Sequence, residues 1–352
     1  MPRASMPYHA RRVNGGSVRL GIDFGTTRTV VAAADDGRYP LVTFDVPSGF
    51  VDHVPGLAVE GQRGLLFGWD ARAALAGGGA AVRSIKRRVG TGFPDDDLAE
   101  LDVSALDLTT GFLAHLRQMI VERGNLEIAP GEELEAMVAV PANSSSRQRY
   151  LTLEAFRAAG FQVVGMMSEP TAGAIEYAFR NKNVLSARSP KRYVVVYDLG
   201  GGTFDTSAIS LTSGEFELIT TEGIPRLGGD DFDEVLLGLA LDEAGIDPRS
   251  LGAAQRVGWL EACREAKETL GPRSRRLLVD PCTLPDLEPI VVDAAVLYAA
   301  CQPLVDRTLV ELDRVFAHLS RYGIDPDDHK VLGAIYVVGG GAAFPSVQKT
   351  LR

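Results

Sequence analysis

Cysteine is scarce in this chain, and long apolar runs are missing from it. Only three cysteines occur among the 352 residues, namely Cys263, Cys282 and Cys301, and no Cys-x-x-Cys pair or Cys/His cluster accompanies them. This usage argues against a zinc site and against a disulfide scaffold, and it fits the reducing cytoplasm. No apolar run approaches the roughly 20 residues that a membrane span requires.

An excess of positive charge is missing as well. The chain has 36 lysines and arginines against 46 aspartates and glutamates, which gives a formal net charge of −10 at pH 7. Nucleic acids and anionic membranes both attract basic surfaces, so this balance argues against either partner. Residues 1–17 are basic and polar without the apolar stretch of a secretory signal, and we expect a disordered tail there.

Glycine, by contrast, is abundant and gathers in runs that follow apolar strands. The β-branched and aromatic segment YVVVY (193–197) is typical of a buried strand, and it leads into DLGGGTFD (198–205). Three glycines continue a strand poorly, because they add no packing and cost conformational entropy. They do let a backbone approach a ligand closely, with N–H groups that suit a phosphate. A tight hairpin turn is the alternative, and this run alone does not decide between the two.

The order of the predicted elements indicates an α/β protein. We expect strands at about 18–24, 29–34, 136–140, 161–167, 193–197, 203–211, 215–223 and 334–338, and helices at about 111–123, 143–159, 170–179, 230–244, 253–270 and 293–320. Residues 38–110, rich in glycine and proline, are expected to be irregular and to form an inserted lobe. Two halves that each open with strand, Asp-x-Gly turn and strand suggest an internal duplication with a cleft between them.

The earlier of these turns, DFGTT (23–27), carries one carboxylate and two hydroxyls. Two such turns that face each other could hold a polyphosphate through backbone N–H groups and threonine hydroxyls. Their aspartates could then hold a hydrated Mg²⁺ ion, which keeps several waters and takes few carboxylates. Phosphoryl transfer asks mainly for such positioning and neutralisation of charge.

These motifs resemble those of the actin-like ATPase superfamily, and more narrowly the nucleotide-binding domain of the seventy-kilodalton heat-shock chaperones (DnaK type). The resemblance covers about residues 18–352 and rests on GIDFGTT (21–27), EPTAGAI (169–175) and DLGGGTFD (198–205). Supporting matches are KRRVG (86–90), VPANSSSRQR (140–149), GGDDFD (228–233), AKETL (266–270) and VGGGAAFPSVQKTL (338–351). It implies an α/β actin-like fold with lobe I at 18–188, lobe II at 189–352 and inserted subdomains at about 38–110 and 229–305. It also implies that the C-terminal end of the domain is truncated.

The resemblance implies a set of site residues. Lys86 would reach the γ-phosphate and the attacking water, Glu169 would lie near that water, and Thr203 and Asp205 would complete the catalytic group. Asp23, Asp198 and Asp205 would hold Mg²⁺, mostly through water. Nucleotide contacts would come from Gly25, Thr26, Thr27, Gly200, Gly201, Gly202, Gly228, Gly229, Lys267, Gly339, Gly340 and Gly341. From spacing alone, Lys86 could instead be solvated surface, and Glu169 could be a charge favoured by a helix dipole.

The adenosine end departs from the family pattern. A glutamate, a lysine and a serine at one-turn spacing hold the ribose and base in the family, and here only Lys267 is kept, since Arg264 and Gly271 stand at the other places. Ala343 replaces an arginine that stacks on adenine, which removes a cation–π face. These changes leave nucleotide affinity and base preference open.

The function implied is an ATP-binding, slowly hydrolysing chaperone domain that uses ATP/ADP and Mg²⁺, with K⁺ as a further cofactor of the family. Implied partners are a J-domain co-chaperone, a nucleotide exchange factor and an attached substrate-binding domain outside this sequence. The alternative is a non-catalytic interaction module that keeps the fold and binds nucleotide structurally. A sugar kinase shares the DFGTT turn, but EPTAGAI counts against it.

Overall fold

The computed structural model describes residues 17–89, 101, 103–181, 191–211, 215–281, 288–328 and 330–352. The expected tail up to residue 16 and Cys282 lie outside the described residues. The chain divides into two compact units, each described below by itself. Unit 1 comprises Met1–Leu75, Gly79–Val140 and Ser144–Met167, and unit 2 comprises Ala76–Gly78, Pro141–Asn143 and Ser168–Arg352. The lobe limits implied by the resemblance stay a prediction.

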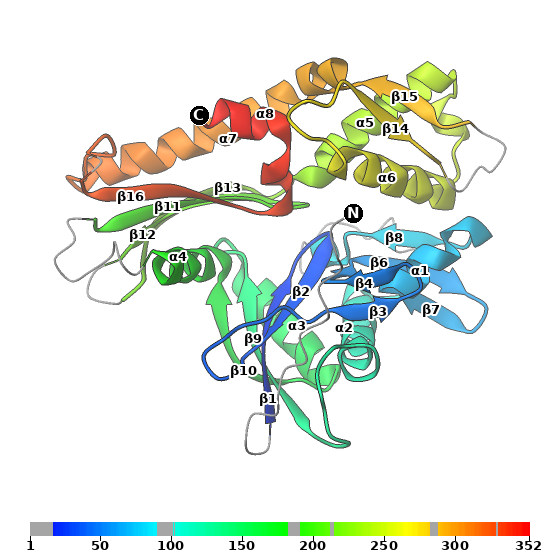
Figure 1. Cartoon of the computed structure of the whole chain (residues 1–352), viewed down its shortest axis with the longest axis horizontal. Helices are drawn as coiled ribbons and strands as arrows, with labels where there is room; N and C mark the ends of the chain where they lie inside the picture. The colour runs from blue at the N-terminus through cyan, green and yellow to red at the C-terminus, as the bar shows by residue number, and fades with distance from the viewer. Residues whose placement is uncertain are drawn as a thin grey trace. The chain divides into compact units, whose positions relative to one another are not determined.

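Unit 1 is built on a five-stranded sheet in the order β10-β9-β1-β2-β5 (Figure 1). Its strands are β1 (Ser17–Phe24), β2 (Arg28–Ala33), β5 (Val54–Pro55), β9 (Glu133–Val140) and β10 (Gln162–Ser168). β1 runs antiparallel to β2 and parallel to β9. Leu20, Ile22 and Phe24 alternate with exposed residues along β1, so the sheet buries one side of this strand.

Two helices cover the buried side of that sheet. In α2 (Ala105–Glu122) and α3 (Ser146–Ala158), Phe112 and Phe156 place their ring centroids 5.9 and 6.1 Å from that of Phe24. α3 starts with a capping box, in which Ser145 accepts from the backbone N–H of Gln148 and the Gln148 side chain accepts from the N–H of Ser145. The helix expected after the serine cluster is therefore confirmed, whereas α2 begins six residues earlier than expected.

The expectation of an irregular segment at 38–110 is wrong for its described part. It contains β3 (Phe44–Val46), β4 (Gly49–Val51), β5, β6 (Leu57–Gly61), β7 (Gly64–Phe67), α1 (Gly68–Ala74), η1 (Leu75–Gly77), β8 (Ala81–Arg83) and η2 (Ile85–Arg88), and α2 begins within it. Most of these strands have three to five residues, too few to show a clear alternation. The β3–β4 and β6–β7 pairs close at Gly49 and Gly64, whose φ values of 118° and 122° favour glycine.

Unit 2 is built on a four-stranded sheet in the order β13-β12-β11-β16. Its strands are β11 (Tyr193–Leu199), β12 (Phe204–Ser210), β13 (Glu217–Ile224) and β16 (Leu332–Val338). On one face lies α4 (Glu169–Arg180), whose Ala174 and Tyr177 pack with Val194, Val196 and Ile209 (Figure 1). Val195, Tyr197 and Leu199 point to the opposite face, into the larger core of the unit.

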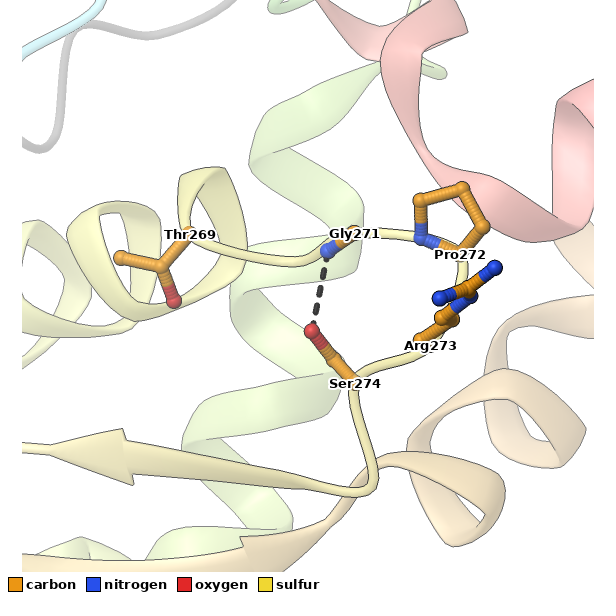
Figure 2. A pocket seen from close by; sticks show the side chains of 5 residues that line it. All are labelled: Thr269, Gly271, Pro272, Arg273 and Ser274. Carbon is orange, nitrogen blue, oxygen red and sulfur yellow. Dashed lines mark hydrogen bonds between the residues drawn. The ribbon is translucent and has the colours of Figure 1, made fainter.

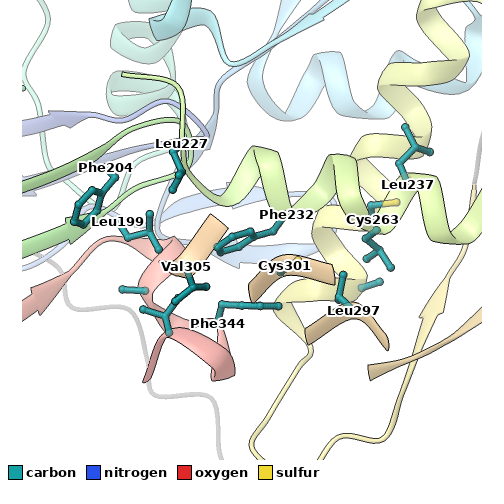
Figure 3. Packing of buried hydrophobic residues seen from close by; sticks show 14 of the residues in the cluster. Leu199, Phe204, Leu227, Phe232, Leu237, Cys263, Leu297, Cys301, Val305 and Phe344 are labelled. Atoms are coloured by element: carbon teal, nitrogen blue, oxygen red, sulfur yellow. The ribbon is translucent and has the colours of Figure 1, made fainter. Parts of the chain in front are cut away.

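The larger core of unit 2 is formed mainly by helices. They are α5 (Gly229–Ala244), α6 (Ala253–Glu268), α7 (Ala294–Arg321) and α8 (Pro345–Thr350), with η4 (Pro248–Ser250), η5 (Gly340–Ala343) and the hairpin of β14 (Arg276–Val279) and β15 (Ile290–Asp293). Phe232 of α5 stacks at 4.7 Å on Phe344, and the buried thiols of Cys263 and Cys301 belong to the same cluster (Figure 3). Among the described helices, none is long and apolar enough to cross a bilayer.

Candidate functional site

The first Asp-x-Gly turn joins β1 to β2 in unit 1. The N–H of Gly25 donates to the carbonyl of Asp23 at 3.0 Å, and Thr26 beside it is only 6% exposed. A Cβ atom on Gly25 would lie 2.2 Å from the carbonyl oxygen of Arg28, so no larger residue fits this turn without a backbone shift. The chain therefore needs glycine here to reverse direction within three residues.

Lys86 is tied to this turn through Gly56. The N–H of Gly56 donates to the carbonyl of Thr27 at 2.9 Å, and the carbonyl of Gly56 accepts from the N–H of Ile85 at 3.4 Å. Lys86 follows directly in η2, which starts after Ser84 in the left-handed conformation (φ 60°). Thr27 and Lys86 are 59 positions apart in the sequence. The hydrogen bonds of Gly56 nevertheless hold the turn and the lysine on one backbone scaffold.

The second Asp-x-Gly turn is the hairpin between β11 and β12 in unit 2. Leu199 pairs with Phe204, and the N–H of Gly200 donates to the carbonyl of Thr203 at 3.0 Å, so the run is a hairpin turn as the alternative reading proposed. Asp198 and Asp205 are directly opposite each other in this pair. Their side chains lie on the face that α4 covers, because they alternate in phase with Val194 and Val196.

Two carboxylates directly opposite on neighbouring strands repel each other and destabilise a sheet. Asp205 is 7% exposed and accepts a hydrogen bond of 2.9 Å from the Asn143 amide, which relieves part of this cost. A hydrated divalent cation near the pair would attract both carboxylates, and a site with few carboxylates suits Mg²⁺. In the described part of the chain no group of three or more His, Cys, Asp or Glu side chains has metal-binding geometry.

Three glycine runs pack against one another beside this pair, and we call them the glycine stack (Gly200–Gly202, Gly228–Gly229 and Gly339–Gly341). A Cβ atom on Gly228 would lie 2.6 Å from the backbone of Gly201 and Gly202. One on Gly339 would lie 2.3 Å from the carbonyl oxygen of Leu199, and one on Gly341 2.7 Å from that of Gly200. The runs touch through backbone alone, which explains why glycine recurs at each.

The glycine stack also closes the N-terminus of α5. The N–H of Gly229 donates to the carbonyl of Gly200 at 3.0 Å, and the N–H of Asp230 donates to that of Gly201 at 2.7 Å. These donors would otherwise be free for an anion at the start of the helix. The N–H of Gly229, which is itself buried, is therefore not free to contact a nucleotide.

Lys267 lies at the edge of the glycine stack and is engaged by protein groups. Its Nζ donates to the carbonyl of Gly229 at 2.5 Å and forms an ion pair of 2.6 Å with the Asp233 carboxylate, which is 1% exposed. Cys301 lies in the same environment, where burial raises the pKa of its thiol to about 12. Lys267 thereby fixes the first turn of α5 to the end of α6.

Arg264, which stands where the family has a glutamate, is turned inward. Its guanidinium pairs with Glu261 at 2.9 Å and with Glu268 at 3.2 Å, and Arg264 and Glu261 are both 4% exposed. The three residues form an ion triad along one face of α6. Ala343, by contrast, is exposed at the end of η5.

The predicted site residues are thus distributed over both units. Asp23, Gly25, Thr26, Thr27 and Lys86 gather around the first turn, and the remaining ones gather around the glycine stack, with Glu169 at the first position of α4. Gly56, Asn143 and Asp233 lie at these sites although no sequence motif predicted a role for them. A lone glycine after Pro55 and a polar residue after a strand end are the available signals, but neither indicates the distant residue that it contacts.

Comparison with known proteins agrees with these features. A family model described as Hsp70 protein matches residues 123–352, more than half of the chain. Proteins named Chaperone protein HscA homolog from Polynucleobacter asymbioticus, Herminiimonas arsenicoxydans and Chromobacterium violaceum are 28%, 31% and 32% identical to it, over 99%, 94% and 94% of the chain and 55%, 53% and 53% of their own lengths. The chain thus spans about half the length of the curated relatives it matches. Its mixed sheets and helices agree with the α/β actin-like ATPase fold expected from the motifs, and the chain belongs to the Hsp70 family.

Proposed function

We propose that this chain is an ATP-binding and slowly ATP-hydrolysing domain of an Hsp70-type chaperone. The observation that carries the proposal is the glycine stack beside the paired carboxylates of Asp198 and Asp205. A backbone surface without side chains and a repelling carboxylate pair are both costly for a fold alone. Both become useful when a phosphate chain with its Mg²⁺ occupies them.

The chain's own residues would act by positioning and by charge. Asp198 and Asp205, together with Asp23 of unit 1, would hold the hydrated Mg²⁺, which neutralises phosphate charge when bound. Thr203 and the exposed backbone of Gly339 and Gly340 would contact phosphates. Glu169 would orient the attacking water from the start of α4.

Lys86 would supply a positive charge to the γ-phosphate as negative charge develops there. The hydrogen bonds of Gly56 link the backbone of η2 to the DFGTT turn, so the backbone position of Lys86 is fixed relative to that turn. A preorganised charge of this kind is worth about 10²-fold to 10³-fold in rate.

Single-turnover hydrolysis of labelled Mg-ATP by the full chain tests the proposal. We expect measurable hydrolysis in the native chain and a loss of about 10²-fold or more in Lys86→Ala, with ATP still bound. Lys349→Ala, which removes an exposed lysine on α8, is the matched control and should leave the rate unchanged.

The outcome also separates the alternative function. ATP bound but cleaved by neither the native chain nor Lys86→Ala would identify a non-catalytic interaction module. Failure to bind any nucleotide would refute both readings. The proposal also includes K⁺ as a cofactor, a cytoplasmic location and movement of the lobes during the ATPase cycle. The partners that it includes are a J-domain co-chaperone, a nucleotide exchange factor and an attached substrate-binding domain.

A further inference from the structure

The side chain of Asn143 is directed to a buried carboxylate and not to the helix that follows it. Asn143 lies in the connection between β9 and α3, and the N-cap of α3 is Ser145, so the Asn143 amide does not cap that helix. Its Nδ2 instead donates to Oδ1 of Asp205 at 2.9 Å. Asn143 itself is exposed, whereas Asp205 is buried. A surface side chain thus contacts one of the two carboxylates proposed to hold Mg²⁺.

The chemistry of the two groups determines what this contact does. An ionised carboxylate only accepts hydrogen bonds, and of the two ends of an amide only the NH₂ group donates them. A hydrogen bond to an ionised group is about twice as strong as one between neutral groups. The last torsion of an aspartate is otherwise broad and roughly two-fold. The Asn143 amide therefore holds the Asp205 carboxylate in one orientation.

Gly223 provides the space for this hydrogen bond. It lies on β13 directly opposite Asp205 in the antiparallel pair with β12. A Cβ atom on Gly223 would lie 2.6 Å from Oδ1 of Asp205 and 3.0 Å from Nδ2 of Asn143, so a larger residue would displace both atoms. Asn143, Asp205 and Gly223 all belong to unit 2. Three separate segments of that unit thus meet at one carboxylate oxygen.

The orientation of Asp205 matters because of the carboxylate opposite it. Asp198 pairs directly with Asp205 across the hairpin of β11 and β12, and like charges in this arrangement repel each other. Rotation of the Asp205 carboxylate away from Asp198 would lower that repulsion. It would also disturb the near-ideal octahedral geometry that Mg²⁺ demands of its ligands. The hydrogen bond from Asn143 opposes this rotation.

We propose that Asn143 is a positioning residue of the Mg²⁺-nucleotide site, which holds the Asp205 carboxylate in the orientation that the hydrated ion requires. The proposal rests on the proposed function, because that function assigns Mg²⁺ to Asp198 and Asp205. It adds a residue that acts on the ion through Asp205, and a reason for glycine at position 223. A hydrogen bond with a structural role alone would affect stability and leave the contribution of Mg²⁺ unchanged.

The contribution of Mg²⁺ to nucleotide binding tests the proposal. The dissociation constant of the full chain for a ribose-labelled fluorescent ADP is measured once with Mg²⁺ and once with EDTA. The ratio of the EDTA value to the Mg²⁺ value reports what the ion adds. Asn143→Leu nearly keeps the size of the side chain and removes its donor. We expect this variant to lower the ratio by about tenfold, as for other residues that orient a metal ligand, and to leave the EDTA value within about twofold.

Two control variants remove a hydrogen bond elsewhere. Asn125→Leu is the same substitution in unit 1, where the Asn125 side chain accepts from the N–H of Thr43 at 3.0 Å. Ser274→Ala removes the hydroxyl that accepts from the N–H of Gly271 at 3.0 Å, on the turn after α6 in unit 2 (Figure 2). Both variants should leave the ratio unchanged. A fall in either as large as that in Asn143→Leu would overturn the assignment of Asn143.

Gly223→Ala tests the space around the hydrogen bond independently. Its new methyl group would displace the donor and the acceptor, so the ratio should fall in this variant as well. Gly238→Ala is its control, because no atom lies within 4 Å of that Cβ position. A native ratio in Gly223→Ala would contradict the role given to Gly223.

The outcomes separate this inference from the proposed function. An unchanged ratio in Asn143→Leu, or an equal rise of both dissociation constants, would overturn the inference and leave the proposed function standing. A ratio near one in the native chain would overturn the assignment of Mg²⁺ to the carboxylate pair. Failure of the native chain to bind the labelled ADP at all would overturn the proposed function and this inference with it.

Discussion

Replacing Gly228 by alanine introduces a methyl group into a crowded backbone contact of the glycine stack. The new Cβ would lie 2.6 Å from the carbonyl carbon and oxygen of Gly201 and from the nitrogen of Gly202. Those atoms belong to a hairpin turn held between two strands, and the carbonyls of Gly200 and Gly201 accept the first N–H groups of α5. Neither the hairpin turn nor the start of α5 can move away without breaking these hydrogen bonds. The residue's own backbone tolerates alanine, because its φ of −173° is extended.

The expected cost follows from these contacts. Overpacking of a close contact costs about 1–3 kcal/mol. Loss of the two hydrogen bonds that join the turn to α5 would add about 1 kcal/mol each. We therefore expect Gly228→Ala to lower the free energy of unfolding by about 3–5 kcal/mol and to weaken nucleotide binding, since the stack itself must shift.

Gly238→Ala in the same helix is the matched control. No atom lies within 4 Å of its Cβ position, so alanine should stabilise the helix by about 0.5–1 kcal/mol. Urea denaturation followed by circular dichroism measures both variants against the native chain. Shifts of the two midpoints in opposite directions support the close contact, whereas a Gly228→Ala variant as stable as the native chain would refute it.

Three further predictions concern buried charges and thiols. Lys267→Met should cost about 3–5 kcal/mol in urea denaturation because it removes the positive charge that pairs with the buried Asp233 carboxylate, and Lys267→Met combined with Asp233→Leu should recover most of that loss. Burial lowers the pKa of His115, so the unfolded chain binds its proton first as the pH falls below about 6.5. Stability should therefore fall from pH 7.5 to 5.5, and His115→Gln should reduce that difference in melting temperature; an unchanged difference would contradict it. The pKa of Cys301 is raised from 9.0 to about 12, so its contribution to stability is intact below pH 9 and declines between pH 9 and 12. Iodoacetamide at pH 8.5 should modify Cys301 only after unfolding in urea, as peptide mass mapping would show.

Much of the fold follows from local signals in the sequence. The β-branched run YVVVY, the capping residues Ser145 and Gln148, and the glycine after β1 each act within a few residues, so they predict elements without knowledge of the packing. The glycine run after YVVVY led to the prediction of a phosphate-binding backbone, which stays a prediction. Short strands such as β3 and β4 were not predicted, because three residues are too few to show the alternation of buried and exposed side chains that marks a strand.

The sequence by itself thus determined the strand–turn–strand units, most helix limits and the family. Only the tertiary structure decided which side chains meet, because those contacts join residues far apart in the chain. Asn143 reaches Asp205 across 62 positions, and Lys267 reaches Gly229 across 38. Arg264 is the contrasting case, because its partners Glu261 and Glu268 lie at the helical spacings i−3 and i+4, which the sequence shows. Only the burial of that triad was decided by the packing around α6.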